Sequence, residues 1–214
     1  KKEKAQGSER KNHFYDISNW TGTYAYTEQN HTNFEVEKDM VKNYRGGLNY
    51  SFNASPKNIK PFGKVKALNK SKYLKLIGDF NFYLLPKQIG FRTDVNRMYS
   101  ERVIRNVNPN TTANIPSLYN KNFNWGRMYD LKYDLTKSLK VNFSATNNGL
   151  IEEGDEFYDQ IDRKANPDTF QLFKDAVFKS LGEFGTNLNY RHNTNINYTL
   201  PLSKIPITDW INST

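Results

Sequence analysis

Residues 187–202, NLNYRHNTNINYTLPL, alternate between apolar and polar side chains with almost no interruption. A repeat of two is the period of a β-strand, whose successive side chains point to opposite faces. Asparagine is depleted in ordinary strands, because its amide competes for backbone hydrogen bonds. The asparagine row therefore indicates either a water-facing surface over a soluble core or the lining of a water-filled membrane barrel. The apolar row is Leu188, Tyr190, Ile196, Tyr198 and Leu200, and the polar row is Asn189, Arg191, Asn193, Asn195 and Asn197.

The same alternation recurs at residues 123–145, where it predicts a β-hairpin. Two strands are joined there by a short turn at residues 136–138. In the first strand, Leu131 and Tyr133 share the apolar face, and Arg127 is the one residue that interrupts it. The opposite face of the same strand carries Asp130 and Lys132.

Further strand patterns bring the expected total to about eight. Residues 43–53 alternate clearly, with Gly46 and Gly47 leaving room for a bend or a close backbone approach. Weaker patterns lie at 14–27, 33–41, 79–85 and 89–99.

The connections between these strands are uneven in length. Turns at 86–88, 136–138 and 201–206 are short, whereas the links at 106–122 and 147–185 are long. Short turns at one end and long loops at the other are typical of outer-membrane barrels. The sequence thus predicts a polar tail at 1–12 and one β-barrel wall over 13–214. Loop insertions are expected at 54–78, 106–122 and 147–185.

One long link contains a predicted helix at residues 167–181. Pro167 and Asp168 form a typical helix start, and Gly182 or Gly185 a typical end. Its apolar stripe favours packing on a neighbouring loop or strand end, with docking of a partner protein or a membrane surface as the alternative. That stripe is Phe170, Phe173, Val177 and Leu181. A second, basic helix is expected at 62–77, with a solvated face favoured over an anionic surface as its environment.

Composition narrows the class of protein. The 214 residues are 36% hydrophobic, and no run approaches the ~18–20 apolar residues of a spanning helix, which excludes helical insertion but not a barrel. The net charge of +9 arises from separated patches, a basic one at 55–78 and an acidic one at 151–162. Neither patch interleaves aromatic and basic residues as RNA-binding segments do, so we expect no nucleic-acid partner.

Candidate chemistry is scarce. His13, His31 and His192 are far apart, and cysteine is absent, so a zinc site is not expected. Phosphate-binding, dinucleotide-binding and nucleophile-elbow motifs are missing as well. The acidic run at 152–162 lacks the spacing of an EF-hand loop and is interpreted as a solvated loop rather than a calcium site. We therefore expect no catalytic residue, no cofactor, no metal and no enzymatic activity.

Two blocks, NFYLLPKQIGFRTDVNR within 71–106 and LPLSKIPITDW within 198–214, resemble the SprA/Sov family. That family forms the giant outer-membrane β-barrel translocon of the type 9 secretion system, which also serves gliding motility. Residues 15–53 fit such barrels too, so the resemblance spans most of the chain. It implies a protein-conducting pore in the cell outer membrane. The implied partners are plug and shuttle accessory proteins, secreted cargo, membrane lipid and the remainder of a much longer barrel chain.

The resemblance assigns a solvent to each face of the strands. Tyr190, Ile196, Tyr198, Leu200, Leu131 and Tyr133 would face lipid. The lumen would be lined by Asn189, Arg191, Asn193, Asn195, Asn197, Asp130 and Lys132. His192, Thr194 and Arg127 fall on the supposed lipid face, where an arginine costs ~2–4 kcal/mol at the midplane and ~0–1 near the interface. These three are therefore expected at the membrane edge, beyond it or beneath covering protein.

Two alternatives to a translocon remain open at this stage. One is a small-solute porin or receptor-type outer-membrane barrel, perhaps closed by these strands alone. The other is a soluble all-β binding domain whose tyrosine-rich faces form a core. The last residues, Ile211 to Thr214, resemble the start of another strand, which favours an arc of a larger antiparallel barrel with short helical insertions in its long loops.

Overall fold

The computed structural model describes residues 13–63, 65, 75–107, 115–154 and 167–200. Six long strands form one antiparallel sheet in the order β1-β2-β5-β6-β7-β8, so that strands adjacent in the sheet follow one another along the chain apart from one excursion. Their bounds are Trp20–His31 (β1), Val36–Asn53 (β2), Gln88–Ile104 (β5), Leu118–Asp134 (β6), Leu139–Leu150 (β7) and Thr186–Tyr198 (β8).

The remaining elements are short or lie beside the sheet. Between β2 and β5, the excursion contains a separate two-stranded pair, β3 (Asn58–Ile59) with β4 (Phe82–Tyr83), and the single turn of helix α2 (Lys75–Gly78). A 3₁₀ turn, η1 (Ile17–Asn19), precedes β1. The one long helix in the described part of the chain is α3 (Pro167–Gly182), between β7 and β8.

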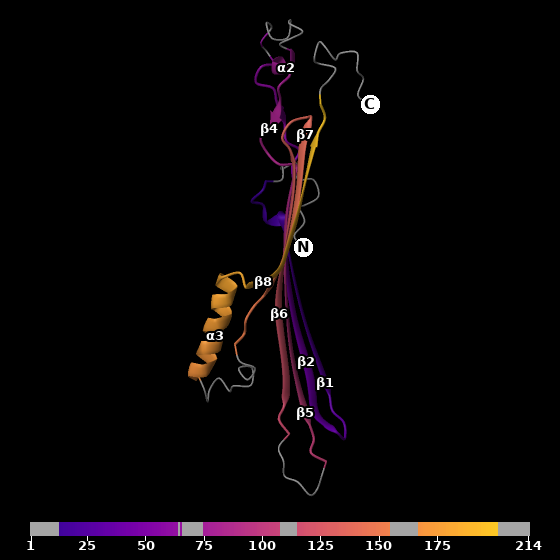
Figure 1. The fold of residues 1–214 in the computed structure, drawn as a ribbon, viewed down its shortest axis with the longest axis vertical. Helices are drawn as coiled ribbons and strands as arrows, with labels where there is room; N and C mark the ends of the chain where they lie inside the picture. Colours follow the sequence, from indigo (N-terminus) through magenta and orange to yellow (C-terminus); the bar gives the residue numbers. More distant parts are fainter. Residues whose placement is uncertain (1–12, 64, 66–74, 108–114, 155–166, 201–214) are drawn as a thin grey trace.

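The sheet is a long, narrow, single layer (Figure 1). Seen edge-on, the strands run from the β3–β4 pair at one end to the β1–β2 turn at the other, and α3 lies alongside the lower half. No second sheet covers it within the described residues, and its outer strands β1 and β8 do not pair with each other. The fold is therefore mostly antiparallel β, and this part of the chain forms an open sheet.

The predicted hairpin at 123–145 is confirmed and is longer than expected. β6 and β7 pair from Asp134↔Lys140 through Asn124↔Leu150. The turn is held by Thr136, whose hydroxyl accepts hydrogen bonds from the backbone N–H groups of Ser138 (3.1 Å) and Leu139 (2.9 Å). Such a side chain-to-backbone bond is the usual reason for threonine in a tight turn.

Other strand boundaries differ from the expectation. The separate strands predicted at 33–41 and 43–53 are wrong, because β2 runs unbroken through both. Gly46 and Gly47 do not end it but make room for neighbouring side chains. A Cβ added to Gly47 would lie 2.7 Å from the Thr23 hydroxyl and 3.0 Å from a carboxylate oxygen of Asp94. Close approach, rather than a bend, explains this pair of glycines.

The predicted loop insertions are also shorter than expected at their strand ends. β6 already begins at Leu118 and β7 extends to Leu150, so the links are 105–117 and 151–185 rather than 106–122 and 147–185. The two strands gain these residues because Leu118–Asn124 continues the pairing with β5 and Thr146–Leu150 continues the pairing with β6 and β8. Helix α3 is confirmed within a residue of its predicted end.

Two further expectations meet the structure only partly. The described residues contain eight strands, the number expected, but they are not the eight strands expected. Two of those are a single strand, β2, whereas β3 lies in the loop insertion expected at 54–78 and pairs with β4 outside the main sheet. Of the basic helix expected at 62–77, the described residues include only the single turn α2, and residues 64 and 66–74 lie outside the described residues. The turn expected at 201–206 lies outside them as well.

Burial is slight for a chain of this size. The buried apolar side chains in the described residues are Val36, Met40, Phe52, Tyr99, Ala145 and Ile151. Large apolar side chains are instead exposed along the strands, and no large side chain among the described residues is completely buried. The sheet therefore has no apolar core of its own on either face. Because burial of apolar area is the main source of folding free energy, the sheet alone gains little stability from it.

Candidate functional site: an apolar band opposite a polar wall

The strand register assigns each side chain of the main sheet to one of two faces. Ile196 lies opposite Val141, and Val141 lies opposite Tyr133, so these three side chains share a face. Asn195 lies opposite Asn142, and Asn142 lies opposite Lys132, which places them on the other face. The rows predicted separately for residues 123–145 and 187–202 thus belong to the same two faces of one sheet.

One surface, here called the apolar face, is aromatic and aliphatic across all six strands. Followed through the register, it contains Trp20, Tyr24, Tyr26, Tyr44, Leu48, Tyr50, Phe52, Ile89, Phe91, Val95, Phe123, Trp125, Tyr129, Leu131, Tyr133, Leu139, Val141, Phe143, Ala145, Tyr190, Ile196 and Tyr198. Many of these side chains are exposed, with Tyr24 at 74% and Ile196 at 64%. An apolar surface of this extent is not a normal feature of a protein in water and marks a contact with protein or lipid.

Aromatic rings pair across the strands of the apolar face. Trp20 and Tyr50 have ring centroids 4.8 Å apart, and Phe91 and Tyr129 have centroids 5.3 Å apart. Cross-strand aromatic pairs of this kind contribute roughly 0.2–1 kcal/mol each to a sheet. They also fix the rotamers of large side chains that no covering layer holds in place.

The opposite surface, here called the polar face, is rich in asparagine. Of the sixteen asparagines in the six long strands, thirteen lie on it. They are Asn43, Asn49, Asn53, Asn96, Asn120, Asn122, Asn124, Asn142, Asn148, Asn189, Asn193, Asn195 and Asn197. Its charges nearly cancel, because the basic Arg45, Arg92, Arg102, Lys132, Lys140 and Arg191 are accompanied by the acidic Asp39, Asp94, Asp130 and Asp134. The face is hydrated but close to neutral.

Only part of the length of the apolar face carries mainly apolar side chains. This part is here called the apolar band. The band covers residues 20–26, 44–52, 89–95, 123–133, 139–145 and 190–198 of the six strands. These runs are seven to eleven residues long, so three of the six reach the ~9–11 strand residues that cross a bilayer at a tilt and three are shorter. Strands β2, β5 and β6 continue well past the band.

Beyond the band, the same face becomes charged. Lys38 forms an ion pair with Glu101, with 2.7 Å between the ammonium nitrogen and a carboxylate oxygen. Glu28 lies opposite Lys42. Hydrogen bonds to the Glu28 carboxylate from the Tyr26 hydroxyl and then from the Asn30 amide hold its pKa below the ordinary range. The same face thus changes from aromatic to charged residues along its length.

Three of the residues that break the apolar band are accommodated in different ways. Arg127 is 6% exposed and lies under the turn at Phe184, and such a covering is one of the three placements expected for it. His192 is exposed and rests against the ring of Tyr190, with centroids 5.5 Å apart. Thr194 lies opposite Phe143 and remains exposed. Leu200 follows the end of β8, so the register does not place it on either face.

The stripe of α3 proposed for partner docking faces the sheet rather than open solvent. Phe170, Phe173, Val177 and Leu181 are all half-buried, whereas Gln171 and Asp175 on the other side of the helix are exposed. The ammonium of Lys121 lies 5.8 Å from the centre of the Phe173 ring. The stripe thus lies on the side of α3 toward the sheet, and the opposite side of α3 is exposed.

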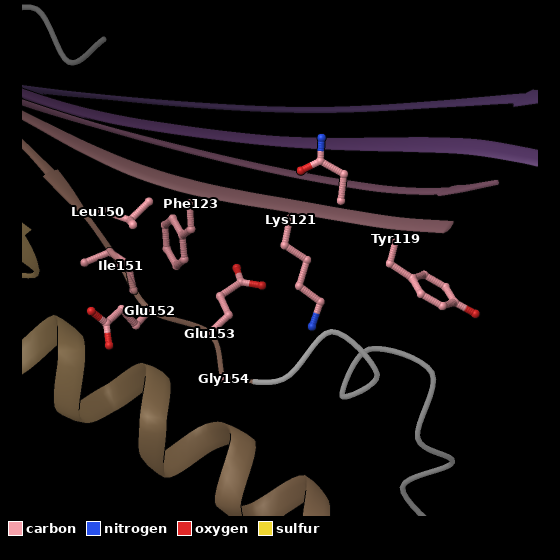
Figure 2. A pocket seen from close by; sticks show the side chains of 9 residues that line it. Tyr119, Lys121, Phe123, Leu150, Ile151, Glu152, Glu153 and Gly154 are labelled. Atoms are coloured by element: carbon pink, nitrogen blue, oxygen red, sulfur yellow. The ribbon is translucent and has the colours of Figure 1, made fainter. Parts of the chain in front are cut away.

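A hollow of about 400 Å³ lies between residues 119–123 of β6 and residues 150–154 (Figure 2). Lys121 and Glu153 both point into this space, and Tyr119 lines its outer end. Glu153 is buried and forms a two-pronged ion pair with Arg97, with 2.9 Å between the second pair of atoms. No sequence pattern signals this pair, because 56 residues separate its members.

These hollows show no arrangement of catalytic groups. A second one, of about 510 Å³, lies mainly on the polar face between Ala25, Gly47 and Asp94. Within the described residues, no cluster of three histidine, cysteine or carboxylate side chains could hold a metal ion. The same residues contain no helix long and apolar enough to cross a membrane.

Comparison with known proteins identifies no relative of this chain. No family model matches the chain, and no curated protein shows significant similarity to it.

Proposed function

We propose that the chain is part of the wall of an outer-membrane β-barrel, with the apolar band against lipid and the polar face toward a water-filled lumen. One observation carries this proposal: the register places aromatic and aliphatic residues on one face of all six strands and thirteen asparagines on the other. In lipid, every backbone polar group must be bonded within the protein, and a closed antiparallel barrel, of which this sheet would be one arc, is one of two structures that achieve this.

A soluble all-β binding domain is less well supported by the same surface. A soluble sheet with one apolar face needs a second layer to cover it. In the described residues, covering elements contact the apolar face at only a few places. The Tyr50 hydroxyl donates to the carbonyl of Phe14, and that of Tyr133 to the carbonyl of Tyr83. Phe184 lies against Trp125 and Arg127. The intervening aromatic residues are left for an environment that is itself apolar.

Within the barrel class, we propose a protein-conducting translocon of the type 9 secretion system, located in the cell outer membrane. The resemblance of residues 71–106 and 198–214 to the SprA/Sov family supports this assignment. The character of the polar face agrees with it, because neutral amides hydrate a passing polypeptide without binding it through charge. Open strands at β1 and β8 require further strands, which a longer chain of the same protein would supply.

The proposed partners follow from this role. They are the remainder of the barrel chain, outer-membrane lipid, plug and shuttle accessory proteins, and secreted cargo. A small-solute porin or receptor barrel remains the second candidate, since a two-faced wall would serve it equally well. Passage of proteins rather than solutes is what distinguishes the two functions.

Depletion of the full-length protein in its native cell is the experiment that distinguishes them. We expect cargo proteins to accumulate in the periplasm within the time needed to dilute the protein, while uptake of a small solute is unchanged. Re-expression of the full-length protein is the control and should restore secretion. Normal secretion with impaired solute uptake would instead identify a porin.

A further inference from the structure

Arg127 lies at the centre of a compact cluster on the apolar face. The carbon atom of its guanidinium group is 4.9 Å from the centre of the Trp125 ring and 5.3 Å from that of the Phe184 ring. The two rings themselves stack, with centroids 5.9 Å apart and an interplanar angle of 27°. A cation in contact with two aromatic faces and shielded from water is held more strongly than one at an exposed site.

The guanidinium is also bonded to groups on both sides of the α3 link. One of its terminal nitrogens donates to the Phe184 carbonyl and to the Asn147 side-chain oxygen, both at 3.0 Å, and more weakly to the Asn187 side chain at 3.5 Å. All three acceptors are neutral, and the structure gives Arg127 no ion pair within the described residues. Its contacts therefore connect strands β6, β7 and β8 with the turn that follows α3.

The backbone after α3 is shaped to bring Phe184 to this cluster. Gly185 N–H bonds to the Ser180 carbonyl at 2.8 Å and Phe184 N–H to the Leu181 carbonyl at 3.1 Å, which is the hydrogen-bond pattern of a Schellman helix end. The left-handed position in this motif usually holds glycine, but here it holds Phe184 with φ of 62°. A residue with a Cβ is disfavoured in that conformation, so the contacts of its ring and carbonyl must compensate.

The neighbouring strands are adapted to the same turn. The β7–β8 register shifts between Asn148 and Gly149, which brings Asn187 opposite Gly149. A Cβ added to Gly149 would lie 3.3 Å from the Phe184 carbonyl, so the absence of a side chain there admits the turn. At Gly185, an added Cβ would lie 2.6 Å from the Leu150 carbonyl.

We propose that Arg127, Trp125 and Phe184 form an anchor that docks the turn at 183–185, and with it helix α3, onto the apolar-face side of the wall. On the proposed function, on which this orientation rests, that side is outside the lumen. Helix α3 then stands beside the barrel rim, where cargo within the pore does not reach it. The same anchor explains how an arginine is tolerated in the apolar band.

Three variants of the full-length protein in native outer membranes test the anchor. R127L removes the cation and all three hydrogen bonds, F184G removes the ring and relieves the left-handed backbone, and R127K keeps the charge without the planar guanidinium. The reporter is A176C in every background, because Ala176 is half-buried in the hollow of about 430 Å³ between α3 and residues 152–154. The rate at which a water-soluble maleimide labels this cysteine reports how far α3 has moved away from residues 152–154.

We expect R127L and F184G to raise the labelling rate of the A176C reporter at least tenfold, and R127K to restore only part of the protection. Tyr129→Leu is the matched control, since Tyr129 lies on the same strand and face but packs against Phe91, and it should leave labelling unchanged. Outer-membrane abundance should be normal for R127L, because leucine suits a lipid-facing position and one buried nitrogen of Arg127, Nε, already lacks a hydrogen-bond partner.

The two proposals fail in different ways in this experiment. Unchanged labelling of the A176C reporter in both R127L and F184G would overturn the anchor, whatever the location of the protein. Absence of the wild-type protein from the outer membrane would overturn the proposed function. The labelling comparison could then still be made on the purified protein and would decide the anchor alone. Faster labelling of R127L together with full rescue by R127K would show that charge rather than stacking holds the turn.

Discussion

Gly47 shows at the scale of a single residue how closely three strands of the sheet approach one another. Its missing side chain leaves space that the Thr23 hydroxyl and the Asp94 carboxylate occupy from the two adjacent strands. A Cβ added to Gly22, in contrast, would have only one neighbouring atom within 4.0 Å, the Gly47 carbonyl oxygen. An added methyl group would therefore be crowded at Gly47 but not at Gly22, although both residues lie within strands.

G47A should lower the stability of the barrel, because the new methyl group must displace two polar side chains. Overpacking of this kind costs typically ~1–3 kcal/mol. G22A is the matched control and should have little effect or a slightly stabilising one. The measurement is the temperature at which the full-length protein, extracted in mild detergent, loses its folded mobility on a gel. Equal midpoints for the two variants would contradict the close packing described at Gly47.

At the scale of elements, the sequence was sufficient to predict strand pairing where neighbours in the sheet are also neighbours along the chain. The β6–β7 hairpin and its turn at Thr136 follow from alternation and turn chemistry alone. The division of β2 into strands at 33–41 and 43–53 was wrong, because Val41, Lys42 and Asn43 continue the pairing with β1 on one side and with β5 on the other. The total of eight strands agrees with the expectation, but β3 was not among the strands predicted, and no periodicity separates the short β3–β4 pair from the main sheet.

Contacts between distant segments could not be predicted in this way. Arg127 was recognised as an exception in its row, and a covering group was one of the explanations offered. Its actual cover, Phe184, is 57 residues away and sits in a sequence, GEFG, that indicates only the end of a helix. The ion pair of Arg97 with Glu153 is equally remote in sequence.

Helix α3 provides the prediction that belongs to this scale. F173D combined with V177D places charge on the half-buried side of the helix, and we expect it to release α3 from the wall without removing the barrel from the membrane. L172D combined with F178D alters two exposed side chains instead and is the matched control for released packing. Labelling of the A176C reporter and co-purification of accessory proteins are measured together in both variants.

The two readouts separate packing from docking. If the stripe packs on the wall, F173D/V177D raises labelling and L172D/F178D does not. Loss of accessory proteins from L172D/F178D alone would place the docking surface on the exposed side of α3. If F173D/V177D loses those proteins while the A176C reporter remains protected, the stripe itself contacts the partner, and its packing role would be refuted.

At the scale of the whole molecule, the described sheet lacks a layer that covers all of its aromatic face and strands that pair with its two edges. Its aromatic face is covered at only a few places in the described residues, and its edge strands β1 and β8 are open there. In water, such a sheet would expose both apolar area and unpaired backbone groups, which favours aggregation. Lipid on one face and further strands at each edge remove both problems at once.

The most direct test of this account is a scan of four consecutive positions on β6 in the intact protein. Cysteines are introduced singly at Asp130, Leu131, Lys132 and Tyr133 and treated in native outer membranes with a water-soluble maleimide. If the sheet divides lipid from water, the cysteines at 130 and 132 are labelled when the lumen is open, and those at 131 and 133 resist. Equal labelling of all four would show that this strand does not separate two solvents, and the membrane-wall account would then be wrong.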